Sequence, residues 1–122
     1  MGTTGPSIRE VALRALYQFD TEGLFVRDAL SDLFKQVAFD GRNRSLATEL
    51  VYGTVRWRKR LDWVLDQLIR RGTDSLTPWI RNILRMGVYQ LMMMDQVPDA
   101  AATDEAVKLA KRYGHKGTVG LT

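Results

Sequence analysis

The chain has 122 residues, of which 45% are hydrophobic and 26% charged, enough for one domain with a hydrophobic core. It contains no Cys, which excludes a disulfide scaffold, a thiolate zinc site and a Cys nucleophile within this sequence. The start lacks the apolar segment of a signal peptide, and no apolar run approaches the roughly 20 residues of a membrane span. We therefore expect a cytoplasmic protein without membrane contact.

The formal net charge of +4 is concentrated in the middle of the chain. Residues 1–41 hold four cations and six anions, residues 42–71 hold eight and three, and residues 72–122 hold six and five. A localised basic stretch is one signature of a nucleic-acid-binding surface. A run of charges on a helix is more often a solvated face. Charge alone therefore leaves both interpretations open.

The first elements are a short arm and a helix. Residues 1–6 are expected to form a loose arm, and the domain is expected to cover residues 7–122. Ser7, followed three positions later by Glu10, predicts a helix N-terminus with a capping box. Apolar residues then recur at helical spacing, and Gly23 predicts the stop.

The middle of the chain predicts more helix. A second helix is expected over residues 26–37, followed by a turn at residues 40–41. Residues 42–70 form either one long bent helix or two, with Gly53 marking a bend or a close helix crossing and Gly72 ending the region. Their expected buried side consists of apolar residues: Leu46, Ala47, Leu50, Val51, Val55, Trp57, Leu61, Val64, Leu65 and Leu68.

The last third restarts clearly. Thr77 followed by Pro78 predicts an N-cap with Pro at the first helical position. A final helix is expected to begin near Asp99 or Thr103 and to stop at Gly114. No segment alternates with period two, so the sequence predicts an all-α bundle. The inner face of the helix after Pro78 is expected to hold six residues: Ile80, Ile83, Leu84, Gly87, Val88 and Leu91.

The sequence offers no catalytic or metal site. The one His, His115, lies between two glycines and is interpreted as a loop residue. Asp104 and Glu105 are adjacent and point in different directions on a helix, where they complement the helix dipole. We find no phosphate-binding glycine loop and no nucleophile–base arrangement. We therefore expect no catalysis, no metal and no cofactor in this chain.

Residues 55–63, VRWRKRLDW, hold four cations between two Trp residues. On a helix Trp57 aligns with Leu61 and Leu65, so Trp57 is expected in the core, with the cations on the outer sides. Trp63 lies near Lys59 and Arg60 and is interpreted either as a structural residue in a cation–π contact or as a stacking platform for an RNA base. Spacing alone does not decide between these.

Several segments carry a family resemblance. SIREVALRALYQFDTEG resembles the opening helix of the NusB family, and ILRMGVYQLMMMDQVPDAAATDEAVKLAKRYG is similar to its second signature. The middle segment, ATELVYGTVRWRKRLDWVLDQLI, resembles the form found in the amino-terminal domain of the Sun/Fmu/RsmB ribosomal RNA cytosine-C5 methyltransferases. Antitermination NusB proteins lack its YG-x-x-RW element. The resemblance covers nearly the whole chain.

This resemblance implies a NusB-like fold of two packed helical subdomains and a non-catalytic RNA-binding domain. Such a domain would position ribosomal RNA, with no DNA expected, for a carboxy-terminal methyltransferase domain of the same protein. That missing domain would hold S-adenosylmethionine and the catalytic Cys. From the resemblance and the basic stretch together, we expect these RNA-contacting residues: Arg9, Arg14, Tyr17, Arg42, Arg44, Arg56, Arg58, Lys59 and Arg60.

The sequence departs from the family pattern at two places. The family usually has Asn where this chain has Asp104, and it continues past residues 120–122 into a last helix, which we expect this chain to lack. Two alternatives stay open. One is a stand-alone NusB-like antitermination factor that binds RNA with a ribosomal protein. The other is a protein–protein module whose basic face packs on its own catalytic domain.

Overall fold

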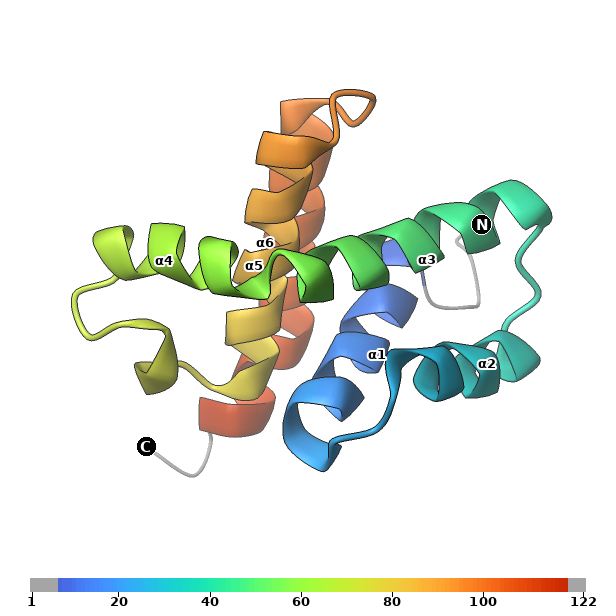
Figure 1. Cartoon of the computed structure of the whole chain (residues 1–122), viewed down its shortest axis with the longest axis horizontal. Helices are drawn as coiled ribbons and strands as arrows, with labels where there is room; N and C mark the ends of the chain where they lie inside the picture. Colours follow the sequence, from blue (N-terminus) through green and yellow to red (C-terminus); the bar gives the residue numbers. More distant parts are fainter. Residues whose placement is uncertain (1–6, 119–122) are drawn as a thin grey trace.

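The structure is a computed structural model and describes residues 7–118, which form six α-helices and one short 3-10 turn (Figure 1). The predicted all-α class is confirmed. No helix in this part of the chain is long and apolar enough to cross a lipid bilayer. The elements in chain order are α1 (Ile8–Glu22), α2 (Val26–Gln36), α3 (Gly41–Arg56), α4 (Arg58–Leu68), η1 (Thr73–Ser75), α5 (Pro78–Met93) and α6 (Asp99–Thr118).

Three predicted helix ends are confirmed: the starts at Ser7 and Thr77 and the stop at Gly23. The Ser7 side chain accepts a hydrogen bond from the backbone N–H of Glu10 at 3.1 Å, which caps α1. Thr77 caps α5 in the same way, and Pro78 occupies the first helical position. Gly23 ends α1 in the left-handed region with φ 70°, a conformation that glycine adopts without steric cost.

Residues 42–70 form two helices rather than one. The break lies at Trp57, whose φ of −97° and ψ of 15° depart from helical values, and α3 and α4 continue nearly in line across the molecule (Figure 1). Gly53 does not bend α3. It is the close-crossing residue, because a Cβ atom there would overlap the ring of Tyr89 on α5.

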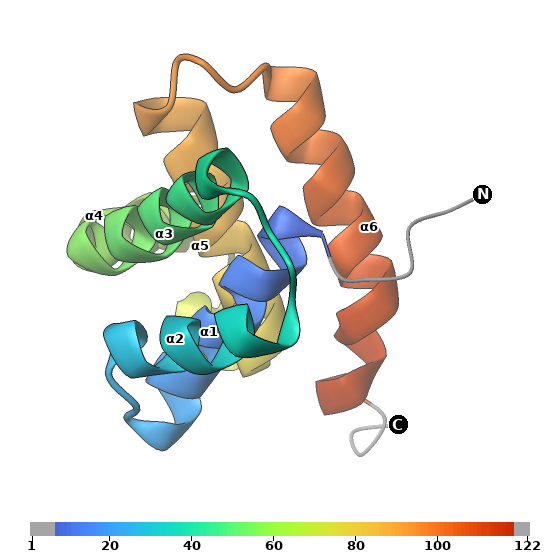
Figure 2. The ribbon, with the colours of Figure 1, turned by 90° about the vertical axis from the view of Figure 1, so that its right-hand side faces the viewer.

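The bundle is organised around α1 and α5. Helix α1 packs against α2, α3 and α5, while α5 also contacts α4 and α6. Helices α5 and α6 pack against each other, and α6 lies at the edge of the molecule (Figure 2). All six helices contribute side chains to one hydrophobic core. Its most deeply buried side chains include Leu13, Leu16, Leu50, Leu61, Ile83 and Met86.

Several predictions about individual residues are wrong, among them that His115 lies in a loop, since position 115 belongs to α6. Gly114 does not end the last helix, because α6 continues to Thr118; Gly114 instead lies where a Cβ would be 3.4 Å from Ile80 of α5. Leu68, expected on the buried side, is 76% exposed at the last position of α4. Leu91 is half exposed because it borders an apolar hollow of about 170 Å³ between α5 and α6 rather than a packed neighbour.

A partly buried polar network holds α1, α4 and α5 together. The Arg85 guanidinium donates to both carboxylate oxygens of Asp62, at 2.7 and 2.8 Å. Asp20 accepts from Arg81 at 2.9 and 3.0 Å and from the Asn82 amide at 2.9 Å. These cations are neutralised inside the fold, so they are not available to an external anion.

Candidate nucleic-acid interface

The basic stretch lies at the junction of α3 and α4. Arg56 ends α3, and Arg58 begins α4 after the break at Trp57. Arg56, Lys59 and Arg60 are exposed, whereas Arg58 is partly buried with its guanidinium 5.0 Å from the centre of the Phe19 ring. The junction therefore presents three exposed cations, while the fourth, Arg58, lies against an aromatic ring and is partly buried.

The position of Trp57 contradicts its prediction, and that of Trp63 fits one of its two interpretations. Trp57 was expected in the core but is 43% exposed. The alignment with Leu61 assumed one continuous helix, whereas α3 ends and α4 begins at Trp57, where φ is −97° and ψ is 15°. Trp63 is 58% exposed, and the Arg60 guanidinium lies 5.5 Å from its ring centre, as the cation–π interpretation predicted.

A hollow along α3 brings together cations from two separate parts of the sequence. It has a volume of about 530 Å³, and Arg44 and Arg56 border it with Glu49, Tyr52 and Tyr89. Burial raises the pKa of the Tyr89 hydroxyl and the charge of Glu49 adds to the rise, while the positive charge of Arg56 opposes it. The predicted residues Arg44 and Arg56 thus share one surface.

The cations of residues 42–71 have one electrostatic property in common. Within the part of the chain that the structure describes, none of the eight forms an ion pair. All are exposed except Arg58, which is partly buried. Their charge is therefore free to attract an anionic partner, unlike that of Arg81 and Arg85.

The predicted residues on α1 lie in a different environment. Arg9 donates from Nε to the Gln90 side-chain oxygen at 2.7 Å. Arg14 donates to the Tyr113 hydroxyl at 3.1 Å and to Glu10 at 3.0 Å. The hydrogen bond with Tyr113 is the main reason that the pKa of Arg14 is raised. These two cations are engaged inside the fold.

Tyr17 belongs to an aromatic stack that the sequence did not indicate. The centres of the Tyr17 and Trp79 rings are 3.8 Å apart, and Trp79 also stacks on Tyr113 with a distance of 4.7 Å between the ring centres. A separate hollow of about 370 Å³ is bordered by this stack together with Arg14 and Arg112. The structure therefore places Arg14 and Tyr17 together, and it places them in a different hollow from Arg44 and Arg56.

The side chain of Glu10, predicted to complete a capping box at the start of α1, instead accepts hydrogen bonds from other side chains. The carboxylate is almost fully buried and accepts hydrogen bonds from Tyr113, from Arg14 and, at 3.3 Å, from Arg112. It thereby ties α1 to α6. The spacing of Ser7 and Glu10 identified the helix start, but no signal in the sequence pointed to the partner helix.

Comparison with known proteins gives a consistent family. The NusB family profile matches residues 6–122. The probable ribosomal RNA small subunit methyltransferase B of Bacillus subtilis is 37% identical over 111 residues, which are 91% of this chain and 25% of that protein. The chain thus spans about a quarter of the length of the methyltransferase relatives that it matches.

A second group of relatives has a similar length. The transcription antitermination protein NusB of Trichlorobacter lovleyi is 34% identical over 88% of this chain and 77% of its own length. The fold is similar to that in the crystal structure of antitermination factors NusB and NusE in complex with dsRNA, with a TM-score of 0.79, 24% identity and coverage of 87% of this chain and 80% of the other. By sequence and by fold, the chain belongs to the NusB family.

Proposed function

We propose that this domain binds RNA through the exposed cations of α3 and of the α3–α4 junction. The observation that carries the proposal is their lack of ion-pair partners among the described residues, together with the shared hollow of Arg44 and Arg56. Phosphate oxygens accept from Arg and Lys without regard to base sequence, so this face supplies affinity and orientation. Arg9 and Arg14 remain predicted contacts, and each would first have to leave an internal hydrogen bond.

In the whole protein, we infer that the domain holds small-subunit ribosomal RNA for a 5-methylcytosine methyltransferase domain that binds S-adenosylmethionine. Two observations support this role: the 37% identity to the Bacillus subtilis methyltransferase B, and the YGTVRW element of residues 52–57. A tethered RNA-binding domain raises the effective concentration of its RNA at a neighbouring active site. The domain itself takes no part in the chemistry.

Antitermination is the second candidate function. It is favoured by the 34% identity to the Trichlorobacter lovleyi NusB, of which the matched segment is 77% of the length. Reading the gene past the codon for residue 122 separates the two. A continuation with a glycine-rich cofactor loop and a Pro-Cys pair supports the methyltransferase. A stop codon within the length of one helix contradicts it.

RNA binding is tested on the chain itself. The variant Arg56→Gln/Lys59→Gln/Arg60→Gln removes three exposed charges and leaves the anchored Arg58 in place. We expect its affinity for a single-stranded RNA to fall. The slope of log affinity against log salt should become shallower by about 2, since each lost phosphate contact removes roughly 0.7 from it. Lys108→Gln/Lys111→Gln on α6 is the control, with near-unchanged binding expected. An unchanged slope in the triple variant would remove the junction from the RNA site.

A further inference from the structure

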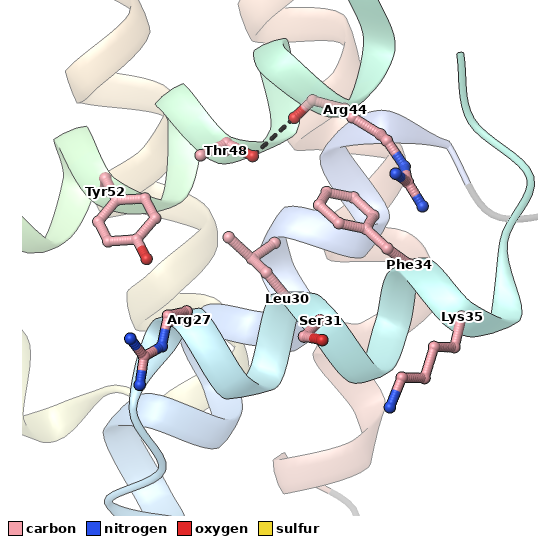
Figure 3. Close-up of a pocket in the computed structure, with 8 residues that line it drawn as sticks. All are labelled: Arg27, Leu30, Ser31, Phe34, Lys35, Arg44, Thr48 and Tyr52. Carbon is pink, nitrogen blue, oxygen red and sulfur yellow. Dashed lines mark hydrogen bonds between the residues drawn. The ribbon is translucent and has the colours of Figure 1, made fainter. Parts of the chain in front are cut away.

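Another hollow lies between α2 and α3, on the side of α3 opposite to the hollow that Arg44 and Arg56 border. It measures about 410 Å³ and is bordered by the buried Leu30 and by Phe34 of α2 and by Thr48 and Tyr52 of α3 (Figure 3). Arg27 lies at the Tyr52 end, and Arg44 lies at the Phe34 end. The hollow thus combines an apolar base with a cation at each end.

The cations of this hollow lack strong internal partners. Arg27 approaches Asp28 only at 3.9 Å and Lys35 approaches Asp32 at 4.0 Å, and all four side chains are more than half exposed. Such exposed pairs contribute little and leave both cations available. Among the residues that the structure describes, no carboxylate borders this hollow. Its charge is therefore complementary to an anion.

Arg44 and Tyr52 give the hollow its geometry. The Arg44 guanidinium lies 5.1 Å from the centre of the Phe34 ring, a cation–π contact that holds the charge over the hollow. Tyr52 is 38% exposed and, within the described residues, stacks on no other ring. An exposed aromatic ring in a hollow that carries cations is an arrangement by which proteins bind unstacked bases.

The two hollows along α3 form one continuous surface. Both are bordered by Arg44, Thr48 and Tyr52, and the hollow on the α5 side extends to Arg56. These four residues are spaced four apart and so lie in a row on one helix face, about 18 Å long at 1.5 Å per residue. Tyr52 stands between the two hollows, with a cation on either side of it along the row.

We propose that the α2–α3 hollow holds one unpaired nucleotide of the bound RNA. The base stacks on Tyr52, and the flanking phosphates are held by Arg27 and Arg44. The inference rests on the proposed RNA-binding function and deepens it, because it assigns the domain a single-stranded substrate. A duplex keeps its bases stacked inside and offers nothing to Tyr52, whereas a single strand does. Arg27 and Tyr52 thereby become binding residues that the basic stretch did not include.

The test uses a 12-nucleotide single-stranded RNA of mixed sequence with a central 2-aminopurine, and the same strand annealed to its complement. Stacking on aromatic rings tolerates any base, so no special sequence is needed. We expect the wild type to prefer the single strand and to quench its fluorescence. Tyr52→Ala should weaken single-strand binding on the order of tenfold and reduce the quenching, whereas Tyr52→Phe should retain both.

Two further variants test the cation at the Tyr52 end and supply a control. Arg27→Gln, at a highly exposed position, should weaken binding and lower the salt slope by about 0.7. Phe25→Ala removes an exposed aromatic residue that borders neither hollow and should change nothing. If Tyr52→Ala binds the single strand as tightly as the wild type, or if the duplex binds equally well, the nucleotide site is wrong while RNA binding stands.

Two other outcomes also decide the matter. An acidic, Phe-containing peptide that binds the wild type but not Tyr52→Ala or Arg27→Gln, with RNA affinity unaffected, would make the hollow a protein-docking site and overturn the proposal. Absence of any RNA binding by folded protein at low salt would overturn the proposed function and the nucleotide site together.

Discussion

Gly53 of α3 lies directly against the ring of Tyr89 on α5, so closely that even a methyl group at position 53 would overlap the phenol. Tyr89 is 7% exposed and packed in the core, so its ring has little room to move away. We expect Gly53→Ala to destabilise the protein by about 1–3 kcal/mol through overpacking, despite the better helix propensity of Ala.

The matched control for this prediction is Gly87→Ala, also in a helix interior. A Cβ there would lie 3.9 Å from Ala106, an ordinary contact. Gly87→Ala should therefore stabilise the protein, by up to about 1 kcal/mol. Urea unfolding of both variants measures the difference. Equal stability of Gly53→Ala and wild type would show that α3 and α5 do not cross at Gly53.

The exposed position of Trp57 predicts an unusual tolerance. Trp57→Ala should cost about 1–2 kcal/mol of the free energy of unfolding, less than the truncation of a core Trp, because 43% of the residue is already in water. Leu61→Ala, one turn later and fully buried, should cost about 2–5 kcal/mol. Thermal or urea unfolding separates the two, and a cost at Trp57 as large as that at Leu61 would restore the core position that the periodicity indicated.

These cases show which features of the fold the sequence could predict. Ser7 and Thr77 cap helices by hydrogen bonds to residues three positions away, so short-range patterns were enough. Trp57 was misplaced because periodicity extends one helical register across a break that only the backbone dihedrals reveal. Gly114 was read as a stop by its residue type, although it serves the packing of α6 against Ile80.

The candidate site was predictable only in part. The basic stretch was visible because its residues are adjacent in sequence, and it includes Arg56. The joining of Arg44 to Arg27 depends on how α2 packs against α3, and no spacing encodes that. Arg27 was overlooked because residues 1–41 carry a net negative charge that masks a locally basic surface.

The buried Arg85–Asp62 pair should be costly to break. Asp62→Ala removes two hydrogen bonds of 2.7 and 2.8 Å and leaves the buried guanidinium with only the longer contacts to Asn82 at 3.3 Å and to Asp20 at 3.5 Å. We expect a loss of about 3–5 kcal/mol. Arg85→Met/Asp62→Leu should recover much of that loss because no unpaired charge remains.

The control for the buried pair is Lys108→Ala. It breaks an ion pair with Glu105, and the Lys108 side chain is 73% exposed. It should change stability by no more than about 0.5 kcal/mol. Similar losses for Asp62→Ala and Lys108→Ala would contradict the account of the buried network.

The Glu10–Tyr113 contact predicts a pH dependence at the alkaline end. Burial, and then the hydrogen bond to Glu10, raise the pKa of Tyr113 in the folded protein above its usual value near 10. Its contribution is complete below about pH 10 and is lost as the pH rises through the folded-state pKa, because the folded state then holds the proton more tightly than the unfolded one.

Stability should therefore fall above about pH 10, and the fall should be shallower in Tyr113→Phe. Some decline should remain, since the pKa of Tyr89 is raised as well. At neutral pH the variant should lose about 1–3 kcal/mol, because Glu10 and Arg14 lose a hydrogen-bond partner. Urea unfolding between about pH 8 and pH 11 measures both effects. Identical alkaline slopes for the two proteins would exclude Tyr113 as the titrating group.

The most direct test of the RNA-binding face is the salt dependence of RNA affinity in Arg44→Gln/Arg56→Gln, compared with Lys108→Gln/Lys111→Gln. Both double variants remove two exposed cations, but only the first pair borders the hollow along α3. We predict that the plot of log affinity against log salt flattens by about 1.4 in Arg44→Gln/Arg56→Gln and keeps the wild-type slope in the control. Equal slopes in all three proteins would contradict the claim that α3 holds the RNA phosphates.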